Sequence, residues 1–126
     1  MALNPSHIVQ IAIPIVDLER AKKFYGETLG LQHLFDAPPS LSFFQCGQTR
    51  LMLSPPEGPD TARGSILYYD VPDARAAAAT IVAEGATLVE GARCIARVGE
   101  RDIWLSLAKD SEGNLFGLMS EEAASG

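Results

Sequence analysis

Apolar and polar residues alternate near the start of the chain and then change to helical spacing. Residues 7–15 predict a strand in which every second position is apolar. One face carries Ile11, Ile13 and Ile15, and the other carries Gln10, Ala12 and Pro14. Asp17 follows as a helix N-cap, the apolar spacing from Leu18 to Leu29 predicts a helix, and Gly30 ends it. Three strand-like segments come next, at residues 31–35, 41–46 and 50–54.

The same order of elements is then repeated. Residues 65–71 predict a strand, Asp73 a second N-cap and Gly85 a second helix stop. The two caps lie 56 positions apart, from Asp17 to Asp73, and the two stops lie 55 apart, from Gly30 to Gly85. Strands are predicted at residues 86–89, 102–108 and 115–120, and the tail after residue 120 is expected to fray. Residues 90–101 fit either one long kinked strand or two strands around 98–100.

This internal repeat predicts an α+β fold made of two modules that together form a single domain, 1–126. Module one spans about residues 6–54 and module two about residues 65–120. Residues 55–64, rich in Pro and Gly and without apolar periodicity, form the expected linker. Each helix is expected to cover one face of a sheet, which leaves the other face for a ligand.

Composition narrows the possible partners. The chain has 126 residues, is 47% apolar and carries a net charge of −6. Its ten Lys and Arg residues are dispersed, which argues against nucleic acid as a partner. An acidic surface would suit a cationic ligand. Neither a signal peptide nor a membrane span is expected, and Cys46 and Cys94 lack the spacing of a disulfide framework or metal site, so we expect a cytoplasmic protein without membrane partners.

Three motifs relate the chain to a known group of proteins. They are Ile-Ala-Ile-Pro-Ile-Val-Asp-Leu-Glu at residues 11–19, Phe24-Tyr25 with Leu29-Gly30-Leu31, and Asp-Ser-Glu-Gly-Asn at residues 110–114. With these motifs the chain resembles the vicinal oxygen chelate superfamily, which includes glyoxalase I, extradiol dioxygenases, methylmalonyl-CoA epimerase and bleomycin-resistance proteins. The resemblance implies two βαβββ modules that form an incompletely closed, eight-stranded mixed barrel-like sheet with the helices outside. It also implies a homodimer, either side by side or with exchanged modules.

Metal enzymes of this superfamily place four ligands on the inner face, two in each module. Carried over to this sequence, those positions fall on Gln10, Met52, Ile66 and Gly117. Gln10 alone offers an oxygen donor, and one neutral amide does not hold a divalent ion. A shift of one residue in register brings still more apolar side chains inward. We therefore predict no metal and no cofactor.

The same inner face supplies the candidate ligand-binding residues. They are Gln10, Ala12, Arg50, Met52, Ile66, Tyr68, Trp104 and Gly117. This mixture of apolar surface and a few polar groups is typical of small-molecule sites. The alternatives stay open: Met52 and Ile66 as plain core, Trp104 as a core or dimer anchor, and Arg50 as a surface charge at a strand edge.

No catalytic motif accompanies these residues. His7 and His33 have no carboxylate at triad-like spacing, and Cys46 has no neighbouring base in sequence. The leading hypothesis is a metal-independent protein that holds a small organic molecule in an apolar crevice. The alternatives are a glyoxalase-like lyase, isomerase or dioxygenase with an atypical site, and an interaction module without a ligand.

Overall fold

The computed structural model describes residues 2–56 and 65–124. The chain divides into two compact units, residues 1–63 and residues 64–126, and each unit contains one four-stranded sheet. The division falls within the predicted linker, of which residues 57–64 lie outside the described residues. Both copies of the repeat therefore form structural modules, as the sequence predicts.

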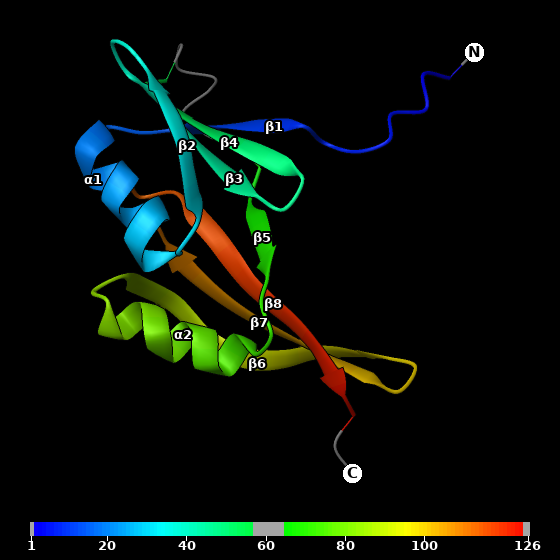
Figure 1. Cartoon of the computed structure of the whole chain (residues 1–126). Helices are drawn as coiled ribbons and strands as arrows, with labels where there is room; N and C mark the ends of the chain where they lie inside the picture. Colours follow the sequence, from blue (N-terminus) through cyan, green and yellow to red (C-terminus); the bar gives the residue numbers. More distant parts are fainter. Residues whose placement is uncertain (1, 57–64, 125–126) are drawn as a thin grey trace. The chain divides into compact units, whose positions relative to one another are not determined.

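Module one has the order strand, helix, three strands (Figure 1). Its elements are β1 (Gln10–Pro14), α1 (Leu18–Lys23) with the π-helical turn η1 (Phe24–Thr28), β2 (Gln32–Ala37), β3 (Leu41–Cys46) and β4 (Thr49–Ser54). In space the strands follow the order β1-β4-β3-β2. Strand β1 pairs with β4 in parallel, and the other pairs are antiparallel.

Module two repeats this topology. Its elements are β5 (Leu67–Asp70), α2 (Ala74–Ala83), β6 (Thr87–Val98), β7 (Arg101–Lys109) and β8 (Leu115–Ala123). The strands follow the order β5-β8-β7-β6, with β5 and β8 parallel. The predicted pair of βαβββ modules is confirmed. The eight strands of the described residues form two hydrogen-bonded sheets of four.

Both predicted N-caps are present, and the first helix differs from the prediction in its second half. The Asp17 carboxylate accepts a hydrogen bond from the backbone N–H of Arg20 (3.1 Å), and Asp73 does so from that of Arg75 (2.9 Å). After Lys23 the helix widens into η1, where the N–H of Leu29 donates to the carbonyl of Phe24. No helix in the described part of the chain is long and apolar enough to cross a membrane.

Each helix covers one face of its own sheet (Figure 1). In module one this face is the core: Phe44, Leu51 and Leu53 are almost completely buried, and the Tyr25 ring lies 6.4 Å from that of Phe44. Gly26 permits this packing, because a Cβ there would lie 3.3 Å from the Phe44 ring. The opposite face, which we call the helix-free face, is left for other contacts.

Module two shows the structure of residues 90–101, and its last strand is longer than the sequence predicts. Strand β6 continues from Thr87 to Val98, with irregular register against β7, and Gly99 follows at a φ of 63°. Strand β7 then begins at Arg101, so the second alternative, two strands around residues 98–100, is the one observed. The tail that was expected to fray after residue 120 instead extends β8, where Glu122 pairs with Asp102.

The Asp-Ser-Glu-Gly-Asn motif forms the connection between β7 and β8. One oxygen of the Asp110 carboxylate accepts from the backbone N–H groups of Glu112 and Asn114, and the other accepts from the Asn114 side chain. Gly113 adopts a φ of 85°, which favours glycine. The motif thus has a structural role, because it fixes the turn that starts β8.

Candidate functional site

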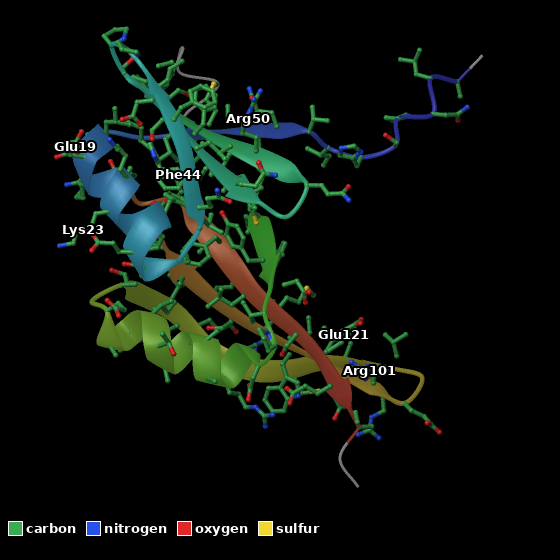
Figure 2. All side chains as sticks on the ribbon, in the orientation of Figure 1. Glu19, Lys23, Phe44, Arg50, Arg101 and Glu121 are labelled. Carbon is green, nitrogen blue, oxygen red and sulfur yellow. The ribbon has the colours of Figure 1, made fainter. Side chains whose placement is uncertain are left out.

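The predicted residues of module one come together on the helix-free face of its sheet. The parallel register places Gln10 beside Arg50 and Ala12 beside Met52. Arg50 Nε donates to Gln10 Oε1 at 2.7 Å, and Gln10 Nε2 lies 3.8 Å from the sulfur of Met52. Strand pairing thus brings Gln10 and Ala12 of β1 next to the two predicted residues of β4 on one continuous surface. Arg50, one of the residues of β4, is labelled in Figure 2.

Two phenylalanines on the same face were missed by the sequence analysis. Phe43 is paired with Met52 across β3 and β4, and its ring stacks on that of Phe35 with centroids 4.5 Å apart. The Arg50 guanidinium carbon lies 5.3 Å from the centre of the Phe43 ring. Phe35 remains 46% exposed. The available signal was the alternation in residues 41–46, which separates Phe43 from the core residue Phe44.

In module two, Tyr68 and Gly117 lie side by side on the parallel strands β5 and β8. A Cβ placed on Gly117 would lie 2.8 Å from Cε1 of Tyr68 and 3.2 Å from a methyl group of Leu105. The Tyr68 ring therefore occupies the space above Gly117, and its side chain is 51% exposed. Ile66 directly precedes β5 and is also partly exposed.

Trp104 does not share this face. It is paired with Ser120, whose hydroxyl accepts a hydrogen bond from the first N–H of α2, at Ala74. The guanidinium of Arg75, also on α2, lies 4.2 Å from the centre of the Trp104 ring. The expectation that Trp104 lies with Gly117 is wrong, because alternation along β7 turns Trp104 to the helix side and Leu105 to the other side.

A polar cluster outside the candidate surface is centred on Asp36. Its carboxylate accepts from Lys22 Nζ at 2.8 Å and from Ser42 Oγ at 2.7 Å, and it lies 2.8 Å from His33 Nε2. The hydrogen bond from Lys22, with those of His33 and Ser42, holds the pKa of Asp36 well below its ordinary value. Ser42 is fully buried and binds the carboxylate directly, so this is not the serine–histidine arrangement of a nucleophile.

Cys46 is half-buried at the end of β3, and burial raises the pKa of its thiol. A thiol with a raised pKa stays protonated, and the thiolate is the nucleophilic form. This agrees with the interpretation of Cys46 as a small, partly buried apolar residue rather than a nucleophile.

Residues 7–118 match the model of a protein family, the Glyoxalase/Bleomycin resistance protein/Dioxygenase superfamily. The chain belongs to this superfamily. The resemblance found from the sequence motifs is thereby confirmed. A comparison with curated protein sequences finds no match.

Several solved structures share the fold. TnmS3, an antibiotic binding protein from Streptomyces sp. CB03234, is 25% identical, with a TM-score of 0.75 over 96% of this chain and 100% of its own. A glyoxalase/bleomycin resistance protein from the same strain is 25% identical, with a TM-score of 0.67 over 89% and 98%. Lactoylglutathione lyase from Agrobacterium tumefaciens is 20% identical, with a TM-score of 0.70 over 93% and 95%, and shows the likeness of fold alone.

The residues at the superfamily's metal-ligand positions do not fit a metal ion. Gln10 Oε1, the one oxygen donor among the four, already accepts a hydrogen bond from the positively charged Arg50. Met52 and Ile66 carry no oxygen or nitrogen donor, and the space above Gly117 is taken by Tyr68. Within residues 2–56 and 65–124, no group of three His, Cys, Asp or Glu side chains could hold a metal ion. No reaction step that uses a bound metal ion is therefore assigned to these residues.

Proposed function

We propose that the chain is a metal-independent binding protein of the glyoxalase/bleomycin-resistance type, which holds a small organic molecule against its helix-free sheet faces. The observation that carries this proposal is the hydrogen bond from Arg50 to Gln10. It occupies the amide oxygen that a metal would need, and the Arg50 guanidinium lies 5.3 Å from the ring of Phe43, on which the partly exposed Phe35 stacks.

The exposure of these side chains supports a ligand rather than a closed core. Phe35 and Tyr68 leave about half of their surface open, although both are large aromatic residues on sheet faces. Burying such rings against an organic molecule stabilises a complex by roughly 25 cal/mol for each Å² of apolar surface removed from water. A large aromatic side chain left exposed on a sheet face is typical of a binding surface.

The described side chains give less support to catalysis. General acid–base chemistry needs a titratable group within hydrogen-bond reach of the substrate. The polar residues that the strand register places on the module-one face include Gln10, Gln45 and Arg50, two amides and a group that stays protonated. The name of TnmS3, an antibiotic binding protein 25% identical over nearly the whole chain, supports a binding function.

The proposal includes a homodimer in the cytoplasm, with both modules acting as one domain. Edge strands and partly exposed apolar faces are the surfaces that a second copy buries in symmetric dimers. Cys46 and Cys94 are both free thiols, which suits a reducing compartment.

A ligand screen on metal-analysed protein tests the proposed function. Untagged protein is purified without chelators, its divalent metals are quantified, and a library of organic molecules is scanned by thermal shift with and without EDTA. We expect less than about 0.1 metal ion per chain and hits that are indifferent to EDTA. Near-stoichiometric metal, or hits that vanish with EDTA, would favour the lyase, isomerase or dioxygenase alternative, and no hits at all would favour an interaction module.

Variants locate the binding surface within this screen. Phe35→Ser and Tyr68→Ser each remove a partly exposed ring from a helix-free face. Val82→Ser on α2, which is 48% exposed, serves as the matched control. We expect at least one of the two aromatic variants to weaken the hits about tenfold while the control leaves them unchanged. Equal effects of all three variants would contradict the location.

A further inference from the structure

Arg50 differs in its partner from three other arginines of the chain. Arg75, Arg93 and Arg97 each lie within 2.8 Å of a carboxylate oxygen. Arg50 instead donates to the neutral amide of Gln10, and no carboxylate of the described residues forms an ion pair with it. A cation whose side-chain partner is neutral keeps its full charge for another group.

The geometry also holds the Arg50 guanidinium in place. Its Nε is fixed by the 2.7 Å bond to Gln10 Oε1, and its carbon lies 5.3 Å from the centre of the Phe43 ring. Nε is the atom engaged by Gln10 and the Arg50 side chain is exposed, so its two terminal nitrogens can donate to a bound group. A positioned guanidinium pairs with a carboxylate through two parallel hydrogen bonds and loses little freedom on binding.

Aromatic surface lies next to this cation. A bulge in β2 between His33 and Phe35 shifts the strand so that Phe35 falls opposite Phe43. The two rings stack with planes 24° apart, and Phe35 stays about half exposed. Planar rings associate by offset or edge-to-face stacking, and such pairs contribute beyond the apolar area that they bury.

We infer that module one selects a flat aromatic molecule that carries an acidic group, such as an aromatic carboxylate or an acidic phenol. The ring lies against Phe35, and the anionic group pairs with the terminal N–H groups of Arg50. This inference rests on the proposed function and narrows its ligand class. The net charge of −6 suggests a cationic ligand, and this inference reverses that expectation. The charge of the ligand is determined by the charged groups at the binding surface rather than by the net charge of the whole chain.

Three probes that share one ring system and differ in charge test the inference. They are 2-naphthoate, 2-naphthylmethanol and 2-naphthylmethylammonium, titrated by calorimetry into the full chain in EDTA. We expect 2-naphthoate to bind at least about tenfold more tightly than the alcohol, and the ammonium probe to bind most weakly. This comparison uses the wild-type chain and so does not depend on the folding of any variant.

Variants assign the preference to Arg50. Arg50→Gln should reduce the advantage of 2-naphthoate over the alcohol to less than about threefold, and Arg50→Lys should keep part of it. Lys23→Gln removes the same charge from the exposed side of α1 (Figure 2) and should leave all three affinities unchanged. An equal loss in the Lys23 variant would overturn the role of Arg50, since it would show a general effect of net charge.

The outcomes separate this inference from the function on which it rests. Equal affinities for the three probes would overturn the anionic preference and leave ligand binding intact. Binding of none of them would also overturn the inference, and the library screen then decides the proposed function. A dimer that weakens in Arg50→Gln, together with no probe binding, would overturn it by showing that a second copy of the chain covers this face.

Discussion

The ring of Tyr68 lies across Gly117, on the neighbouring parallel strand of the second sheet. A side chain at position 117 would collide with this ring and with Leu105. By the resemblance, position 117 corresponds to an acidic ligand of the superfamily's metal enzymes, and in this chain the ring of Tyr68 covers that position. The contact explains why a glycine is needed in the middle of β8, where it otherwise weakens a strand.

Gly117→Ala should destabilise the protein by about 1–3 kcal/mol, because the new methyl group forces the Tyr68 ring to move. Chemical denaturation measures the free energy of unfolding. In a Tyr68→Ala background the same substitution should cost less than about 1 kcal/mol, since the collision with the ring is gone.

Gly91→Ala is the matched control, because Gly91 also lies in a strand and a Cβ there meets no atom within 4 Å. It should be neutral or slightly stabilising. An equal cost of Gly117→Ala in both backgrounds would show that Tyr68 does not restrict this position.

Arg75→Gln should change the fluorescence emission maximum of Trp104, the only tryptophan of the chain. The substitution removes the guanidinium that lies 4.2 Å from the ring and the ion pair with Glu122. We expect a loss of about 0.5–1 kcal/mol in unfolding free energy from the cation–π contact. Arg93→Gln, on β6, should leave the emission unchanged, and an unchanged spectrum in the Arg75 variant would contradict the position of Trp104 beneath α2.

Asp36→Asn should lower the melting temperature at neutral pH and have less effect in acid. The folded-state pKa of Asp36 is depressed below its ordinary value of 3.8, chiefly by Lys22. A depressed carboxyl contributes stability that is complete above the unfolded-state pKa and is lost as the pH falls toward the folded-state pKa. The difference in melting temperature between wild type and variant should therefore shrink below about pH 4.

Glu27→Gln, an exposed change on η1, is the control for Asp36. It should leave the melting temperature nearly unchanged over the same pH range. A constant difference for Asp36→Asn between about pH 7 and about pH 2 would show that the charge of Asp36 contributes nothing to stability.

Divalent metals should not stabilise the protein. A bound ion raises the melting temperature by mass action, whereas Gln10 Oε1 is engaged by a cation and its neighbours lack hard donors. Dialysis against EDTA, followed by addition of Zn²⁺, Ni²⁺ or Mn²⁺, should change the melting temperature by less than about 1 °C. A reproducible rise of several degrees with one of these ions would contradict the assignment.

Local signals in the sequence were sufficient for the repeat, both N-caps and the grouping of Gln10 with Met52. Caps and alternation depend on neighbours in sequence, so they can be predicted from it. Tyr68 and Gly117 could be placed on the same face of their sheet, because the repeat located their strands and side chains alternate between the two faces of a strand.

Three features could not be predicted because they depend on register or packing. The placement of Trp104 failed because sequence does not show which face of β7 the helix covers. Phe35 reaches Phe43 through a bulge, which shifts the alternation by one position. The widening of the first helix at Phe24 has no counterpart in helix propensity, which gives no signal for a π-helical turn.

The most direct test of metal-independent ligand binding is a heteronuclear NMR titration of the ¹⁵N-labelled, EDTA-treated chain with 2-naphthoate. We expect saturable chemical-shift changes at the amides of Gln10, Phe43 and Arg50, with Lys23 on α1 unaffected. Absence of saturable changes, or changes that need added Zn²⁺ or Ni²⁺, would contradict it.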